Sequence, residues 1–155
     1  GNDARLFEDA GAQRVLDFTD FGHATTFGLS ESEVRDIFIS LVDELSKDCG
    51  QGAPDVVIVE IADGIFQGET RDLLADPKFV NTIDSLVFSA GDALGAVGGL
   101  STLVELGHTP IFVSGVLTSS PLATREAMAA LNVPVISTFD LCDGSRARSA
   151  VGLHK

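Results

Sequence analysis

The sequence contains no tryptophan or tyrosine and far fewer basic than acidic side chains. Ten Lys and Arg residues against 23 Asp and Glu residues give a net charge of −13. So acidic a chain repels nucleic acids and anionic membranes, because binding either depends on neutralising phosphates with basic side chains. The lack of Trp and Tyr also weakens the case for an aromatic platform that stacks bases. We therefore expect neither a nucleic acid nor a membrane as a partner.

Long apolar runs and secretion signals are also missing. No apolar run approaches the roughly 18 residues that cross a bilayer, and no basic start followed by an apolar core resembles a signal peptide. Cys49 and Cys142 match no CxxC spacing, which favours two thiols in a reducing compartment over a disulfide. The three histidines follow no zinc-binding pattern, and no GxSxG motif supports a hydrolase triad. The expected location is the cytoplasm.

What the sequence does have is enough apolar residues for a core and a clear helical signal. A chain of 155 residues is expected to form a single domain over residues 1–155, and a hydrophobic fraction of 45% argues against disorder. The stretch LSESEVRDIFISLVDELSKDCG predicts the strongest helix. Ser30 and Glu33 have the spacing of a capping box, and the apolar residues from Val34 to Leu45 recur at helical spacing.

Apolar runs alternate with helical segments along most of the chain. We expect strands at residues 14–20, 56–61, 84–91, 109–118 and 133–139. Strands that are apolar throughout and separated by helices are typical of a parallel sheet covered on both faces. The sequence therefore predicts an α/β fold, a three-layer sandwich with a mostly parallel sheet.

Polar residues gather where these expected strands end. In open parallel sheets, ligands bind beyond the carboxyl ends of the strands, so the loops there are the predicted site. The candidates for contacting substrate or nucleotide follow the first, second and fourth strands: Asp17, Thr19, Asp20, His23, Gln67, Ser114, Thr118 and Ser119. Glu60 and Asp63, after the second strand, are the catalytic candidates.

Two acids have the strongest case as metal ligands. Glu60 closes a buried strand and could hold a hydrated Mg²⁺ beside phosphates, with Asp17 as a second carboxylate. Alternatively, Glu60 caps a loop or pairs with Arg71, and Asp63 serves the turn that it forms with Gly64.

Other features at this edge also have structural explanations. The hydroxyls around Ser119 suit an anion, but Ser120 followed by proline is an ordinary helix start. Gln67 lies in a loop between two glycines and could orient a water molecule, or the loop could be plain surface. The glycines in AGDALGAVGG do not match GxGxxG and are expected to let a helix pack closely on the sheet.

Taken together, VLDFTDFGHATTFGL, DVVIVEIADGIFQGETRDLL, VFSAGDALGAV and VSGVLTSSPLATREA resemble the second half of a P-loop NTPase of the dethiobiotin synthetase-like group. The resemblance covers most of the chain and implies a Rossmann-like, P-loop NTPase-like sheet. It implies that Glu60 helps to hold Mg²⁺ near the γ-phosphate, that residues 17–26 contact substrate or metal, and that the later strand ends form the nucleotide side.

The chain departs from that group in one large respect, because no GxxxxGK[ST] motif occurs in it. The amides and the lysine that cradle the β- and γ-phosphates are therefore missing. The simplest interpretation is that the chain is the C-terminal part of a longer protein, and natural loss of the loop is the second. In either case we expect weak nucleotide binding, no activity of this chain alone, and self-association through an unpaired sheet edge.

Three interpretations of function remain open. The first is part of an ATP- or GTP-dependent enzyme with Mg²⁺-assisted phosphoryl chemistry, acting on a small-molecule substrate. The second is a non-catalytic α/β module that binds a small ligand or another protein. The third is a different metal-dependent enzyme that uses the carboxylates of Asp17, Asp20, Glu60 and Asp63.

Overall fold

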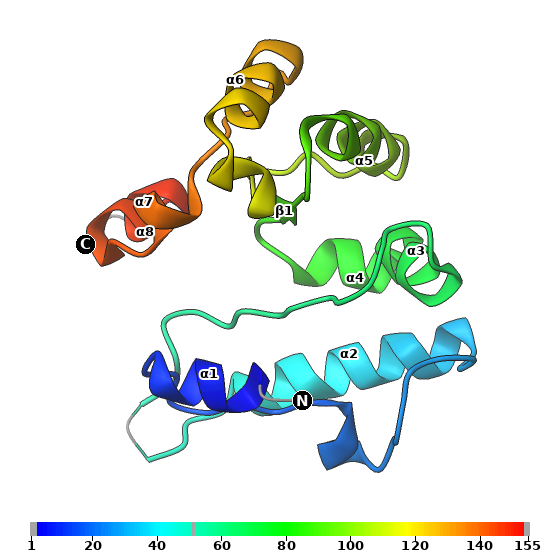
Figure 1. The fold of residues 1–155 in the computed structure, drawn as a ribbon. Helices are drawn as coiled ribbons and strands as arrows, with labels where there is room; N and C mark the ends of the chain where they lie inside the picture. Colours follow the sequence, from blue (N-terminus) through cyan, green and yellow to red (C-terminus); the bar gives the residue numbers. More distant parts are fainter. Residues whose placement is uncertain (1–2, 51, 154–155) are drawn as a thin grey trace. The chain divides into compact units, whose positions relative to one another are not determined.

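The computed structural model describes residues 3–50 and 52–153 (Figure 1). The chain divides into two compact units, residues 1–81 and residues 82–155. Each unit is described by itself below, and the expected single domain stays a prediction. Within the described residues, no helix combines the length and apolar character needed to cross a membrane.

The unit of residues 1–81 is built from helices. Its elements are α1 (Asp3–Asp9), the 3₁₀ helix η1 (Phe18–Phe21), α2 (Glu31–Leu45), α3 (Gly68–Ala75) and α4 (Pro77–Thr82), whose last residue begins the second unit. The expected capping box of α2 is confirmed, because Ser30 Oγ accepts from Glu33 N–H while the Glu33 carboxylate accepts from Ser30 N–H. Asp76 precedes α4, and its carboxylate accepts from Lys78 N–H at 2.7 Å.

The apolar face of α2 supplies the core of this unit. Val34, Ile37 and Phe38 are buried on α2, which packs against α3. Phe38 stacks at a tilt on Phe79 of α4, with ring centroids 4.8 Å apart and an interplanar angle of 52°. Such tilted pairs add to the stabilisation from burial itself. The helical spacing read from the sequence is therefore the spacing that builds this core.

The unit of residues 82–155 combines helices with two short strands. Its elements are β1 (Val87–Ser89), α5 (Ala93–Glu105), β2 (Phe112–Ser114), the 3₁₀ helix η2 (Val116–Ser119), α6 (Pro121–Ala130), α7 (Thr138–Leu141) and α8 (Gly144–Ala150). β1 and β2 are parallel, with Phe88 opposite Val113. One further parallel bridge joins Val113 to Val135.

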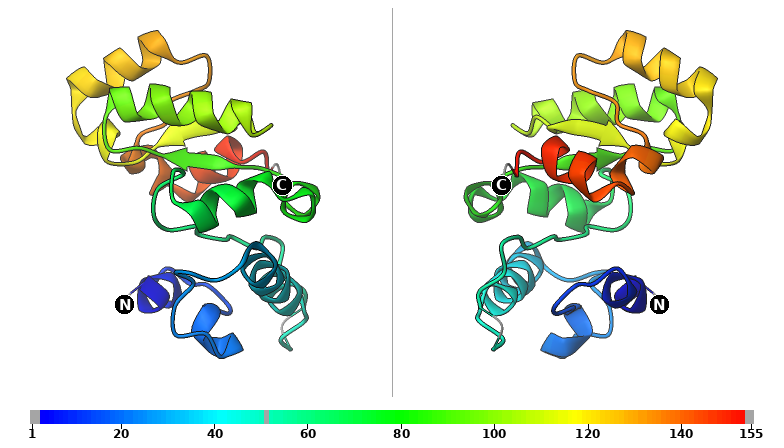
Figure 2. Two further views of the ribbon diagram at one scale, coloured as in Figure 1. Left: turned by 90° about the vertical axis from the view of Figure 1, so that its right-hand side faces the viewer. Right: turned by 90° about the vertical axis from the view of Figure 1, so that its left-hand side faces the viewer.

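Helices α5 and α6 lie on the same face of the strand pair (Figure 2). Between them and the strands lies a core of small and branched side chains: Ala90, Ala96, Val113, Leu117, Ala127 and Val135. Of the four glycines in AGDALGAVGG, only Gly99 meets the sheet closely, because a Cβ there would overlap the Phe88 ring. Gly98 faces open space. The strand–helix–strand connection through α5 is thus confirmed as a parallel unit.

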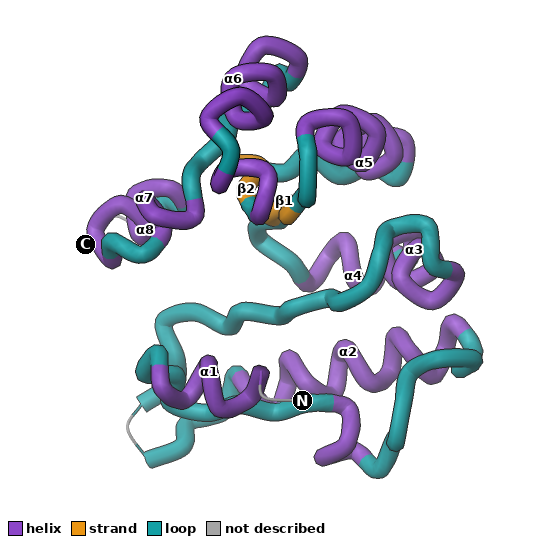
Figure 3. Tube along the Cα trace, in the orientation of Figure 1, coloured by secondary structure: helices purple, strands orange, loops and turns teal. Residues whose placement is uncertain are grey.

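The predicted three-layer sandwich is wrong. The described residues form eight α-helices, two 3₁₀ helices and one two-stranded parallel sheet, so helices dominate and no extended central sheet is present in them (Figure 3). The expected strands at residues 84–91 and 109–118 are real but only three residues long each. The last expected strand contributes a single bridge, and residues 14–20 contain η1 instead of a strand.

Residues 56–61 explain most of this error. The segment is irregular in structure, and no backbone–backbone hydrogen bond joins it to any described residue. Val56, Ile58 and Val59 are exposed, Ile58 at 81%. β-Branched residues favour an extended backbone, but a strand also needs a partner that accepts its hydrogen bonds. The sequence pattern indicates the propensity for an extended backbone, but it does not show whether a partner strand is present.

Candidate functional site

The predicted ligand edge was the carboxyl ends of the expected strands. Within one unit, the structure brings together two of these ends, those of β1 and β2. Ser89 and Ser114 end the two strands and are opposite each other in the register. Because paired residues of parallel strands point to the same face, both hydroxyls lie on one face of the sheet. Phe88 and Val113 point to the other face and pack with the α5–α6 core.

The Ser114 hydroxyl is buried without a partner. The residue is 5% exposed, and within the described part of the chain its Oγ makes no hydrogen bond. Leaving a buried hydroxyl unpaired costs about 1–3 kcal/mol. Native proteins keep few such groups, and each calls for an explanation, for which a ligand or an ordered water is a common reason.

Gly115 brings the two strand ends into contact. A Cβ at this position would lie 2.5 Å from Ser89 Oγ and 2.7 Å from the Ala90 carbonyl oxygen. Its φ of 103° and ψ of −165° belong to a region that only glycine occupies readily. The close approach is fixed by Ala90 N–H donating to Ser114 O at 2.9 Å and Leu117 N–H donating to Ala90 O at 3.1 Å.

Thr118 connects this edge to the next segment. Its buried hydroxyl donates to Gly115 O at 2.8 Å and accepts from Thr138 N–H at 3.1 Å. Ser119 is exposed at the end of η2. Ser120 Oγ accepts from Ala123 N–H, so the helix-cap explanation for Ser120 is confirmed. Ser114 and Thr118 thus share one edge, while Ser119 lies at its surface.

In the unit of residues 1–81, Asp17, Thr19 and Asp20 form a single turn. The Asp17 carboxylate accepts from both Thr19 N–H at 2.7 Å and the Thr19 hydroxyl at 2.5 Å. Asp20 Oδ2 in turn accepts from Asp17 N–H at 2.9 Å, which completes a capping box for η1. The Thr19 hydroxyl, followed by its amide, lowers the pKa of Asp17. The three residues are brought together, and their visible role is to cap a helix.

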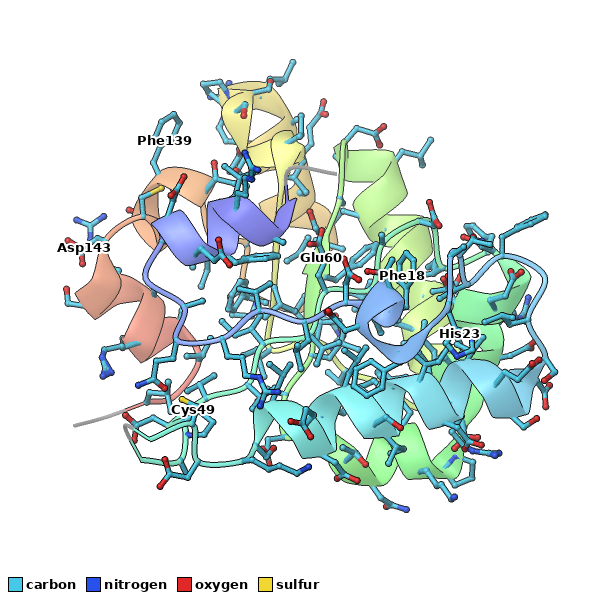
Figure 4. All side chains as sticks on the ribbon, turned by 90° about the horizontal axis from the view of Figure 1, so that it is seen from below. Phe18, His23, Cys49, Glu60, Phe139 and Asp143 are labelled. Atoms are coloured by element: carbon cyan, nitrogen blue, oxygen red, sulfur yellow. The ribbon has the colours of Figure 1, made fainter. Side chains whose placement is uncertain are left out.

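Glu60 and Asp63 differ in their surroundings. Glu60 is exposed and forms no hydrogen bond or ion pair with any described residue, Arg71 included (Figure 4). Asp63 adopts a positive φ of 68°, the only described residue other than glycine to do so, which fits the turn role. Gln67 precedes α3 without a side-chain cap bond.

His23 lines a pocket with residues of α2. The pocket has a volume of about 240 Å³ and is lined by Phe21, His23, Glu33, Asp36, Ile37 and Ser40. All six lie in the unit of residues 1–81. The predicted site residues thus fall into separate groups, with the Asp17 turn, Glu60 and His23 in one unit and Ser114 and Thr118 in the other.

Several features of this edge were missed or left unassigned at the sequence level. Three further residues belong to the edge that carries Ser114 and Thr118, namely Ser89, Gly115 and Thr138. Their position at the ends of expected strands is the sequence signal that could have identified them. Among residues 3–50 and 52–153, no three His, Cys, Asp or Glu side chains form a group that could hold a metal ion. The two thiols, Cys49 and Cys142, are free and exposed, as expected without a disulfide.

Comparisons with known proteins give no relative from which a role could be inferred: no family model, curated protein or solved structure matches the chain.

Proposed function

We propose that the carboxyl edge of the β1–β2 unit binds a polar group of a small ligand, and that this ligand is a nucleotide in an ATP- or GTP-dependent enzyme of the P-loop type. The observation that carries the proposal is the buried Ser114 hydroxyl without a partner. It lies at the end of a parallel strand, and in proteins with open parallel sheets this is the position where ligands bind. Gly115 beside it leaves no room for a side chain.

Chemically, the edge offers hydrogen bonds and little charge. Ser114 Oγ–H can donate to a ligand oxygen, and the exposed hydroxyls of Ser89 and Ser119 add donors at the surface. Asp92 already occupies the start of α5, where its carboxylate accepts from Gly95 N–H at 2.6 Å. These groups suit the sugar or base of a nucleotide better than its phosphates, which need amides, lysine and a metal ion.

We also propose Mg²⁺ as a cofactor, and its candidate ligands belong to the unit of residues 1–81 and are considered apart from the Ser114 edge. Mg²⁺ keeps several waters and takes only one or two carboxylates from the protein. Glu60 fits such a role, because its carboxylate is exposed and engaged by no described residue. Asp17 fits less well, since Thr19 already uses one of its oxygens. The chemistry that such an ion supplies is neutralisation of phosphate charge.

A non-catalytic α/β module that binds a small ligand is the second candidate. It is favoured by the absence of a phosphate-binding GxxxxGK[ST] motif from the sequence. In either case we propose a cytoplasmic protein, in keeping with two exposed free thiols. We also propose a homo-oligomer, since the exposed apolar segment 56–61 leaves its backbone groups unpaired.

Ligand-observed NMR with Mg-ATP and Mg-GTP tests the proposal, because it detects dissociation constants near ~1 mM. We expect weak binding and no hydrolysis by the chain alone. Ser114→Ala should weaken binding about three- to tenfold, the range for loss of one hydrogen bond. Ser101→Ala, an exposed hydroxyl near the far end of α5, is the matched control and should change nothing.

Two outcomes would count against the nucleotide assignment. Binding at micromolar affinity would mean that the chain holds phosphates without the expected loop. If Ser114→Ala leaves the affinity unchanged, the nucleotide binds somewhere other than this edge.

A further inference from the structure

The loop that leads from α2 to α3 contains a β-branched run whose backbone is unpaired (Figure 3). Within the described part of the chain, no backbone–backbone hydrogen bond involves residues 56–61. The run lies wholly in the unit of residues 1–81. Free N–H and C=O groups on residues that favour an extended backbone are a template for pairing with another strand.

The side chains of this run alternate in exposure, as those of a strand at a protein surface do. Val56 is 44% exposed and Ile58 is 81% exposed, and Glu60 is exposed as well. The residues at positions 57 and 61 are half-buried, and Val59 is 37% exposed. Because successive side chains of a strand point to opposite faces, the even-numbered face is the one left open to a partner.

Both ends of the run limit how far a strand can extend. Pro54 has no N–H to donate, so a hydrogen-bonded ladder ends there on one side. Asp63, with its φ of 68°, leaves the extended conformation and ends the ladder on the other side. Ile58 lies near the middle of the stretch between them and is the most exposed of its large apolar side chains.

A second copy of the same run fits this stretch in an antiparallel register. A twofold axis between two antiparallel strands places one residue opposite itself and pairs the others symmetrically around it. With Ile58 at the axis, Glu60 lies opposite Val56 and Asp55 lies opposite Ile61. No two acids then face each other directly.

Other registers are less favourable. Moving the axis one residue toward the carboxyl end would put Asp55 opposite Asp63, and a parallel pair in register would put Glu60 opposite its own copy. Like charges directly opposite each other destabilise a strand pair. Moving the axis one residue the other way would bring Pro54 into the ladder, where it cannot donate.

We propose that two copies of the chain associate through residues 55–61, paired antiparallel with Ile58 opposite the partner's Ile58. This pairing specifies the self-association proposed above and rests on it, but it does not rest on the nucleotide assignment. Because the interface is short, we expect a dissociation constant of roughly 1 μM or above. The charge of −13 on each copy opposes association, so the dimer should become tighter as salt screens that repulsion.

Sedimentation equilibrium of the whole chain, at several concentrations and two salt levels, tests the register with two variants of equal charge. Ile58→Lys places two ammonium groups opposite each other at the axis and should weaken association more than about fivefold. Val56→Lys adds the same charge to the same face but places each ammonium opposite the partner's Glu60. It should strengthen association about two- to fivefold, and this gain should vanish when Glu60→Gln is added.

Disulfide trapping gives a direct readout of the same register. The background is Cys49→Ser with Cys142→Ser, which removes the two free thiols. On it, Ile58→Cys should cross-link to its own copy, because facing Cα atoms of antiparallel strands are about 4.5–5.5 Å apart, within the reach of a disulfide. In Glu60→Cys the two thiols are separated by roughly 13 Å along the strands and should not cross-link.

Three results would overturn the proposed pairing. If Val56→Lys weakens association as much as Ile58→Lys does, or if Glu60→Cys cross-links more readily than Ile58→Cys, the copies meet in another way and only self-association stands. A chain that stays monomeric at every concentration and salt level would overturn both the pairing and the self-association. Nucleotide binding at the Ser114 edge is measured separately and is unaffected by any of these results.

Discussion

Replacement of Gly115 by alanine tests the close approach of the two strand ends. A methyl group there would meet Ser89 Oγ at 2.5 Å and the Ala90 backbone nitrogen and oxygen at 2.8 and 2.7 Å. Backbone atoms cannot rotate away as a flexible side chain can, so the strands must separate. Overpacking of this kind costs about 1–3 kcal/mol.

The backbone conformation adds a second cost. At φ of 103° and ψ of −165°, alanine is strained by about 1–3 kcal/mol. Together the two effects predict a loss of about 2–6 kcal/mol, which is a large part of the roughly 5–15 kcal/mol that stabilises a typical domain. We therefore expect Gly115→Ala to unfold at much lower urea concentration than the unmodified protein.

Two other glycines of the same unit serve as controls. Gly107 also has a positive φ, 88°, but a Cβ there would meet nothing within 4 Å. Gly107→Ala should therefore cost only the conformational part, about 1 kcal/mol. Gly98 lies inside α5 in open space and has an ordinary helical φ, so Gly98→Ala should stabilise by about 0.5–1 kcal/mol.

The assay is equilibrium unfolding in urea, in which the free energy of unfolding is measured against urea concentration for the three variants. If the slope of this dependence is the same in all of them, only stability has changed. The predicted order of stability is Gly98→Ala, unmodified protein, Gly107→Ala and Gly115→Ala. If Gly115→Ala is no worse than Gly107→Ala, the two strand ends do not approach as described.

Two further predictions concern residues 1–81. Ile58→Lys should reduce self-association, measured by light scattering over a range of concentrations, because it puts a charge into the exposed apolar segment 56–61; a protein that is monomeric before the change would refute the reasoning. Lys47, followed by Arg14, lowers the pKa of Glu44 below its ordinary value of 4.5, so the stability from these contacts is present above that value and is lost as the pH falls through the lowered pKa. The melting temperature should therefore fall more between about pH 5 and pH 3 in the unmodified protein than in Glu44→Gln, and equal slopes would contradict the assignment.

Local signals in the sequence predicted the helices well. Ser30 with Glu33, and Ser120 before proline, were read as helix starts, and each serine side chain caps a helix in the structure. These signals depend on residues three or four positions apart, so the sequence alone contains both partners of each interaction.

The sheet was predicted less well because its partners are distant in sequence. The parallel pairing of β1 and β2 follows the expected strand–helix–strand order. The β-branched run Val56–Val59 looked equally convincing, yet it pairs with nothing in the described part of the chain. Extended propensity is local, whereas a hydrogen-bonded neighbour is a property of the whole fold.

In the candidate site, too, some features could be predicted from local sequence and others depend on the whole fold. Ser114 and Thr118 were predicted from their position at a strand end, and the structure brings them to one edge with Thr138. The Asp17 turn was read as a metal or substrate site, and its carboxylates cap η1. What singles out Ser114, a buried hydroxyl without a partner, depends on neighbours that no sequence pattern specifies.

Amide NMR shifts of the whole chain during titration with Mg-ATP test most directly whether the carboxyl edge of the β1–β2 unit receives a ligand. The account predicts changes concentrated at Ser89, Ser114, Gly115, Thr118 and Thr138, and their loss in Ser114→Ala. Changes that avoid these five residues, or that persist unchanged in Ser114→Ala, would contradict it.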